Sequence, residues 1–336
     1  MKIKQKIWIF TIILIGCLGG IIGSIFLYRH NFNRITTIAP NEEILDFEFI
    51  ENRLILLDGN GNVRFFNVSN PEEPQRMDVE GIPLKIETFS VSSDKEWLIT
   101  VDTQEMIKIF NISNTTNLEQ LGGYKISHEV KSISLMEELA FLACGKHGMT
   151  VLNISSPQNI TTALEYPTAT DLQKITIANN LLYLADGENG LRILQITINQ
   201  TLVEVGHYQT AGSVQDISIR GSYAYIAEGK QGFKILNVSY PIYPFPIGHY
   251  NRGGFSNKIS VSSDYVHIAA GSKGVVQIDI KDPNNFDQTY RFDDGSYVSS
   301  VKMKKDYLFA STKGKGIHII DPWDDLEEDW NTGSII

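Results

Sequence analysis

The chain has 336 residues, a formal net charge of −10 and two cysteines. An acidic chain is poorly suited to nucleic acid or anionic lipid as its main partner, because both carry negative charge themselves. Cys17 lies in an apolar segment and Cys144 ends an expected strand, so we expect no disulfide between them. A hydrophobic core must therefore hold the fold, and a domain of about 300 residues can form one.

An uncharged, apolar segment comes first in chain order. It covers residues 7–28, which are 22 residues; at about 1.5 Å per residue a helix of this length spans the roughly 30 Å of bilayer hydrocarbon. Three lysines lie within residues 1–6, which favours that end in the cytoplasm. We predict a transmembrane signal anchor over 7–28, a short tether over 29–32 and an extracytoplasmic remainder at the cell membrane.

Two alternatives to an uncleaved anchor stay open. A cleaved signal peptide has an apolar region of about 7–15 residues and a small-residue cleavage site, whereas this segment is longer and no A-x-A pattern follows it. The run Leu14-Ile15-Gly16-Cys17 resembles a bacterial lipobox, in which the cysteine is lipidated, but eleven uncharged residues follow Cys17. All three interpretations place the rest of the chain outside the cytoplasm.

A repeat of 42 residues organises the rest of the chain, residues 33–322. One polar residue closes the core of each unit, with a first step of 44 residues and five steps of 42: Asn67, Asn111, Asn153, Gln195, Asn237, Asp279 and Asp321. A fixed period in this range indicates stacked or radial copies of one unit that cannot bury its apolar face alone.

Each unit has the pattern of four short strands. In one unit we expect strands over Ile175–Ile177, Leu181–Ala185, Leu191–Ile196 and Leu202–Tyr208. Their short length, alternation and intervening Asn or Gly residues favour strands over helices. A four-stranded antiparallel unit of about 42 residues is typical of one β-propeller blade.

The turn between the second and third strands carries a column of glycines. Its members are Gly148, Gly190, Gly232, Gly274 and Gly316, with Asn62 at the same place in the first unit. Glycine and asparagine tolerate the positive φ that tight hairpins need. Met106 occupies this place in the second unit, so we predict a wider turn there.

Several third strands share a further pattern. The segments GLRILQIT, GFKILNVSYP, GVVQIDIKDP and GIHIIDP resemble the LVIVD repeat, although this chain often has Asn where the repeat has Asp. The resemblance covers residues 33–322 in seven units. It implies a β-propeller, and because LVIVD proteins have poorly defined functions it informs the fold more than the activity.

The last unit lacks one strand and the chain has one to spare. The last unit offers strands over Val301–Met303, Tyr307–Ala310 and Ile317–Ile320, and a spare strand, Asn33–Ile38, precedes the first unit. We predict that the spare strand completes the last blade, because closure removes the exposed sheet edges. The expected fold class is all-β: a seven-bladed propeller of four-stranded blades, preceded by one transmembrane helix.

The closure also assigns the two faces of the ring. If strands A to D run from the channel outward, the chain enters and leaves on the face of the C–D loops, which the short tether turns toward the membrane. At the outward mouth of the channel we predict a binding site formed by the starts of the A strands: Glu87, Lys131, Gln173, Gln215, Asn257 and Ser299, with Leu45 in the first unit. The competing explanation is that any wet channel needs a polar lining.

Other polar motifs point to structure rather than chemistry. The acids that open the B–C turns are typical of turn initiation: Asp58, Asp102, Asp186 and Glu228. The run Asp58-Gly59-Asn60-Gly61-Asn62 begins like a calcium loop but lacks its later Gly and Glu. His128 and His147 can approach each other, yet two histidines rarely form a metal site alone. His207 and His249 share one column of the repeat. We therefore assign no catalytic residue, metal or cofactor.

Three further features belong to the expected surface: a set of sequons, an apolar cluster on one loop and an acidic tail. Seven N-x-[ST] sequons offer glycosylation sites if the source glycosylates: Asn67, Asn111, Asn114, Asn153, Asn159, Asn199 and Asn237. Turn chemistry also explains the four that close the repeat, which are Asn67, Asn111, Asn153 and Asn237. Tyr240, Tyr243 and Phe245 lie on a C–D loop and either contact lipid headgroups or cover a blade edge. Residues 323–336 form an acidic tail, which we expect to be solvated.

These observations favour a membrane-anchored, extracytoplasmic propeller that acts as a non-catalytic binding module. The expected partner is a protein or an envelope glycan at the outward face. A structural scaffold of an envelope complex is the first alternative. A hydrolase or lyase with its site at the channel mouth is the second, because propellers host many chemistries.

Overall fold

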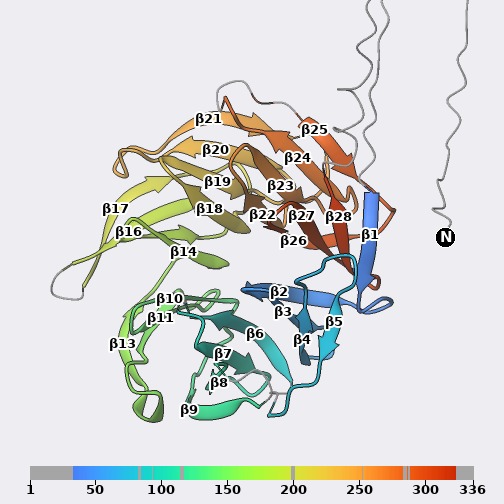
Figure 1. Ribbon diagram of the computed structural model, residues 1–336. Coiled ribbons are helices and arrows are strands. Elements are labelled where there is room, and N and C mark those ends of the chain that lie inside the picture. Colours follow the sequence, from blue (N-terminus) through green and yellow to red (C-terminus); the bar gives the residue numbers. More distant parts are fainter. Residues whose placement is uncertain are drawn as a thin grey trace, which may run out of the picture.

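The computed structural model describes residues 33–322, apart from 82–84, 93, 114–116, 198–200, 252, 283–285 and 287. These residues form seven antiparallel sheets of four strands, arranged as blades around a ring (Figure 1). The predicted seven-bladed propeller is therefore confirmed. No helix in the described ranges has the length and apolar character needed to cross a membrane. The segments 1–6, 7–28, 29–32 and 323–336 lie outside the described residues.

The first three blades follow one another along the chain. Blade 1 contains β2 (Ile44–Ile50), β3 (Arg53–Asp58), β4 (Val63–Asn67) and β5 (Gln75–Met77). Blade 2 contains β6 (Ile86–Val91), β7 (Trp97–Asp102), β8 (Met106–Asn111) and β9 (Glu119–Lys125). Blade 3 contains β10 (Ser132–Met136), β11 (Leu139–Ala143), β12 (Met149–Asn153) and β13 (Thr161–Tyr166), with the short 3-10 helix η1 (Pro157–Asn159) before β13.

The next three blades repeat the same order. Blade 4 contains β14 (Lys174–Ala178), β15 (Leu181–Ala185), β16 (Leu191–Ile196) and β17 (Leu202–Tyr208). Blade 5 contains β18 (Asp216–Arg220), β19 (Tyr223–Ala227), β20 (Phe233–Asn237) and β21 (Phe245–Tyr250). Blade 6 contains β22 (Lys258–Val261), β23 (Tyr265–Ala269), β24 (Val275–Asp279) and β25 (Gln288–Phe292).

Blade 7 joins the two ends of the ring. Three of its strands are β26 (Val298–Lys304), β27 (Tyr307–Thr312) and β28 (Gly316–Asp321), and the fourth is β1 (Asn33–Ile38). β1 lies antiparallel to β28, with Asn33 opposite Asp321 and Ile38 opposite Ile317. The predicted closure by the N-terminal strand is confirmed, and Figure 1 shows β1 beside β28.

The core lies between the blades rather than within them. Seven hydrophobic clusters fill the ring, and each combines buried residues from two neighbouring blades. The cluster at the seam, for example, joins Ile38 of β1 and Phe309 of blade 7 to Phe47 of blade 1. A single blade exposes both apolar faces, so each repeat needs its neighbours to fold.

The C–D loops seal the outer rim at glycines of the D strands. A Cβ on Gly122 of β9 would lie 1.6 Å from the carbonyl oxygen of Pro157, in the C–D loop of the next blade. A Cβ on Gly206 of β17 would lie 1.8 Å from the carbonyl oxygen of Pro241. Only glycine allows the next loop to approach so closely.

The B–C turns differ in part from the expectation. Gly148 and Gly190 both have φ of 82°, as predicted for their column. The turn of blade 2 is not wider, because it has as many residues as the others and Glu105 takes the positive φ, at 59°. In blade 1 the positive φ belongs to Gly61 and not to Asn62. In these two turns the positive φ falls one residue earlier than in the glycine column. Asp58 and Asp102 stabilise this arrangement, because each accepts the backbone N–H of the residue four positions later.

Candidate functional site

The six predicted site residues occupy one end of the A strands. Glu87 and Ser299 lie within the first two residues of β6 and β26, and the other four immediately precede or begin β10, β14, β18 and β22. The backbone N–H of Lys131 donates to Ala143, and Gln173, Gln215 and Asn257 repeat this bond in their blades. The A strands of neighbouring blades pack against one another, so these residues surround the channel mouth.

Most of the mouth side chains are already held by local partners. Lys131 forms an ion pair with Asp171 at 2.7 Å, and the Gln173 amide donates to the carbonyl of Asp171 at 3.1 Å. The Gln215 amide donates to the carbonyl of Ser213 at 3.1 Å. The two glutamines thus bond to the entry loops of their own blades, whereas Lys131 of blade 3 reaches the entry loop of blade 4.

Blades 6 and 7 continue the pattern. The Asn257 amide donates to the hydroxyl of Tyr297 at 3.1 Å, which lies in the next entry loop. The Ser299 hydroxyl lies 2.8 Å from the hydroxyl of Ser311. The first unit departs, because Leu45 is 45% exposed at this position and adds an apolar side chain to the rim.

Glu87 differs from the other five. Within the described residues its carboxylate is exposed and has no hydrogen bond or ion pair. Partial desolvation raises the pKa of Glu87, and the negative charges of Glu129, Glu105 and Asp102 raise it further. The rim of blades 2 and 3 therefore carries an unpaired acid in a negative environment, where a donor or a cation would be favoured.

The channel wall below the mouth is a feature that the sequence reasoning missed. Three residues along each A strand, five blades carry a hydroxyl side chain: Ser90, Ser134, Thr176, Ser218 and Ser260. The Thr176 hydroxyl donates to the carbonyl of Ile217 in the next blade at 2.8 Å. The Ser260 hydroxyl accepts the N–H of Met303 at 3.1 Å. A hydroxyl column at the repeat period was visible in the sequence and could have been found.

Charged residues complete the wall: Lys302 and Glu48 take the place of the hydroxyl in blades 7 and 1, and Asp216 lies two residues before Ser218 in blade 5. Lys302 of blade 7 pairs with Glu48 of blade 1 at 2.6 Å, across the seam of the ring. Asp216 is 1% exposed, forms an ion pair with Lys174 and accepts the N–H of Ile259 at 2.8 Å. Burial alone would raise the pKa of Asp216, but the nearby lysine charges and these bonds hold it below its usual range. The wall therefore joins neighbouring blades through hydrogen bonds and ion pairs.

The acids of the B–C turns have the structural role that turn chemistry predicts. Asp58 accepts the backbone N–H groups of Asn60 and Asn62, so its glycine-rich loop is a hairpin turn. In four blades this acid also pairs with a base six residues later: Asp58 with Arg64, Asp102 with Lys108, Asp186 with Arg192 and Glu228 with Lys234. Each pair connects the B–C turn to strand C of its own blade.

The histidine pairs behave differently from each other. His128 and His147 stack with ring centroids 3.8 Å apart and planes 10° apart, which confirms that they approach. Parallel rings at this distance cannot both direct a nitrogen at one ion. His207 and His249 each place Nε2 2.7 Å from a backbone carbonyl of the B–C turn in the same blade, so this pair is a feature of the repeat.

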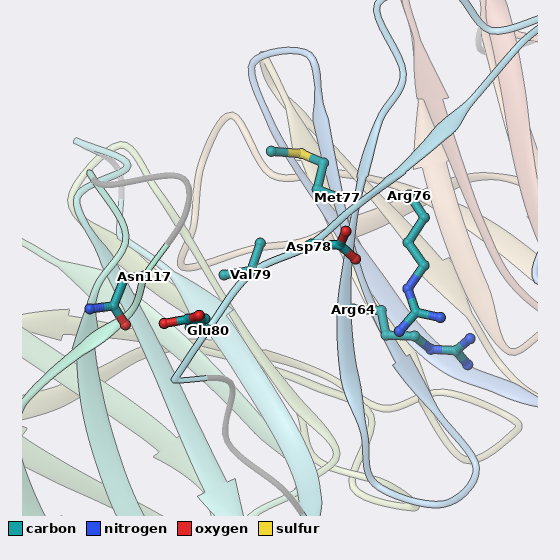
Figure 2. A pocket seen from close by; sticks show the side chains of 7 residues that line it. All are labelled: Arg64, Arg76, Met77, Asp78, Val79, Glu80 and Asn117. Carbon is teal, nitrogen blue, oxygen red and sulfur yellow. The ribbon is translucent and has the colours of Figure 1, made fainter.

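Two cavities lie at the outer rim of the described residues. One of about 410 Å³ occupies the gap where the chain leaves the short strand β5 and crosses to blade 2. Figure 2 shows Arg64 and Arg76 at one end of this cavity and Glu80 and Asn117 at the other. The second, of about 310 Å³, lies between blades 2 and 3 beside His128. Neither cavity includes a residue of the predicted mouth site.

The five sequons within the described residues share one face. Asn67, Asn153 and Asn237 each accept the backbone N–H of the serine two residues later at 2.9 Å, and Asn111 accepts that of Ser113 in the same way. Together with Asn159, these asparagines belong to C–D loops, on the side where the chain enters the ring. Asn114 and Asn199 lie outside the described residues. Turn formation accounts for the four asparagines that close the repeat.

The family comparison agrees with this geometry. The LVIVD repeat model matches four consecutive segments, residues 128–168, 170–210, 211–252 and 253–293. These segments correspond to blades 3 to 6, so the chain contains LVIVD repeats within a seven-bladed propeller. No curated protein matches the chain.

Solved structures support the fold alone. The WD40 repeats of RRP9 are similar with a TM-score of 0.68 and 12% identity, over 87% of this chain and 97% of that one. U3-55K gives a TM-score of 0.66 with 12% identity, over 87% and 98%. The computationally designed Ika8 protein gives 0.63 with 8% identity, over 86% and 99%. At such low identity the likeness extends to architecture and not to partners.

Proposed function

We propose that this chain is a membrane-anchored, extracytoplasmic propeller that binds a protein or an envelope glycan without catalysis. Residues 7–28 would anchor it, and the channel mouth would be its working surface. One observation carries the proposal: Glu87 is exposed and without a partner in the described chain, in a ring whose other polar residues are held in place. Ordered polar side chains around one unsatisfied acid are suited to recognition of a donor-rich partner.

The topology of the ring supports the choice of face. β1 begins and β28 ends on the face of the C–D loops. The mouth site lies on the opposite face, turned away from the proposed anchor. Propellers serve widely as rigid binding modules, and the closed ring described here is compatible with that role.

A photocrosslinking experiment in the native cells tests the mouth. A photoreactive side chain replaces Gln215 in the full chain, and we expect a discrete crosslinked species on illumination. Combined Glu87→Ala, Lys131→Ala and Gln173→Ala changes should abolish that species. The fold should tolerate them, at about 0.5–1 kcal/mol for each half-exposed or exposed residue.

The matched control changes three exposed residues of the C–D loops, Glu72, Glu73 and Gln158, to alanine. This variant should keep the crosslinked species. If both variants lose it, or if neither does, the mouth is not the binding site. A structural spacer in an envelope complex would then be the better interpretation.

A further inference from the structure

A cluster of exposed apolar side chains protrudes from the C–D face of blade 5. We call residues 240–245 the aromatic turn. Tyr240, Ile242, Tyr243 and Phe245 are 72%, 60%, 75% and 49% exposed, and Val203 of the neighbouring β17 is 48% exposed. Five of the seven exposed large hydrophobic residues among the described residues therefore gather in one sector. Such clustering on a soluble surface marks an interaction site.

The aromatic turn is held rigidly, with its side chains directed outward. The N–H of Tyr243 donates to the carbonyl of Tyr240 at 2.9 Å, which closes a β-turn with Pro241 at its second position. The backbone at Pro241 seats against Gly206 of blade 4, where a side chain would clash. The backbone thus covers the blade edge, and the tyrosines remain free. A preordered turn loses little entropy when it binds.

The charge distribution on this face is uneven. Residues 195–203 of blade 4 and 236–245 of blade 5 contain no charged residue. Blades 1 and 3, in contrast, present the exposed acids Glu72, Glu73, Glu137 and Glu138 on the same face. On this face the A–B turn of blade 5 adds only a base, the exposed Arg220. The aromatic turn therefore lies in a sector whose loops on this face would bring no acid against a lipid surface.

The geometry points to one occupant for this surface. We propose that the aromatic turn inserts into the headgroup region of the bilayer that residues 7–28 span, and this inference rests on the proposed anchor. β1 begins on the same face, and the four residues 29–32 reach at most about 14 Å. Tyrosine is favoured at the membrane interface because its ring is apolar and its hydroxyl is polar. The propeller would then rest on the membrane with blade 5 as its contact.

Spin-label accessibility in the full chain tests this proposal. Tyr240→Cys is labelled in a Cys17→Ser background, in which Cys144 is buried and stays unlabelled. The matched label replaces the exposed Lys230 in the B–C turn of the same blade, at its opposite end. Both proteins are reconstituted in phosphatidylcholine vesicles and recovered by flotation.

At position 240 we expect contact with oxygen to exceed contact with a water-soluble nickel chelate, and at position 230 the reverse. Adding Tyr243→Asp should raise the ratio of chelate contact to oxygen contact, measured for the label at position 240, by several fold. Equal behaviour of the two labels would overturn the docking, and so would protection of position 240 from both reagents, which would indicate a protein partner. A chain that fails to float would remove the anchor itself, and the docking with it.

Discussion

His267 of β23 is a buried histidine in a column of apolar residues. The equivalent positions carry Tyr225, Tyr183, Phe141 and Phe309, which fill the space between blades. His267 is 0% exposed, and neither ring nitrogen is hydrogen-bonded within the described chain. Desolvation lowers its pKa to about 4, and Gln277 opposes this shift more weakly. The folded state therefore holds this histidine neutral.

This residue predicts an acid-sensitive stability. In the unfolded chain His267 binds a proton near pH 6.5, and in the folded chain only near pH 4. The contribution of His267 to the free energy of unfolding is therefore fully present above pH 6.5 and is lost as the pH falls toward 4. From pH 7 to 5 the loss should be about 2 kcal/mol. His267→Phe should remove this part of the pH dependence, as measured by urea unfolding of the detergent-solubilised chain.

The equivalent residue of blade 4 provides the control, because its hydroxyl does not ionise between pH 7 and 5. Burial raises the pKa of Tyr183 above its usual value, so Tyr183→Phe should leave the slope of stability against pH unchanged. If His267→Phe and the unmodified chain lose stability in parallel between pH 7 and 5, the buried histidine is not responsible.

At the scale of elements, blade 7 depends on a polar contact as well as on strand pairing. His318 of β28 is 1% exposed; its Nδ1 lies 3.1 Å from the Thr37 hydroxyl of β1, and its Nε2 lies 2.9 Å from Asp294, after β25. Burial opposes ionisation of Asp294, but hydrogen bonds from Ser296 and the nearby positive groups lower its pKa to about 2. One histidine thus connects the closing strand, its partner strand and the neighbouring blade.

Removing the acid should weaken the closure in a pH-dependent way. A depressed carboxyl pKa stabilises the fold above pH 3.8, and this contribution is lost as the pH falls toward 2. Asp294→Asn should lower the melting temperature by a few degrees at pH 7, for a loss of about 1 kcal/mol, and should reduce the loss of stability between pH 4 and 2. Calorimetry and acid titration by circular dichroism measure both effects.

The neighbouring acid separates closure from surface charge. Asp293 pairs with the exposed Arg291 and accepts the N–H of Gly295, and it has no contact with His318 among the described residues. Because the amide oxygen of asparagine can still accept the Gly295 N–H, Asp293→Asn should lower the melting temperature less than Asp294→Asn. An equal effect of the two substitutions would show that His318 does not depend on Asp294.

At the scale of the whole molecule, the proposed topology places the ring outside the cytoplasm and residues 1–6 inside. External protease on intact cells should digest the propeller and spare an epitope tag at the N-terminus. Cys17→Ser should leave the protein in the membrane fraction, because the 22 uncharged residues and not a lipid would hold it.

Two outcomes would contradict this topology. Protection of residues 33–336 in intact cells would place the ring inside. Release of the Cys17→Ser chain into the medium would establish lipidation as the attachment. A cytoplasmic protein that is degraded only after lysis is the matched control for cell integrity.

The sequence by itself determined the number of blades, the four strands of each blade and the closure by β1. It could do so because a strand must direct alternate residues at each neighbouring blade, and a fixed period therefore records the packing of the whole ring. Only the tertiary structure decided which polar groups are free. Lys131 and Gln173 look equivalent to Glu87 in sequence, yet only Glu87 lacks a partner among the described residues, because the partners of the others come from entry loops whose conformation the repeat does not specify. The close approach of the Pro241 backbone to blade 4 likewise depends on Gly206, a residue of another blade.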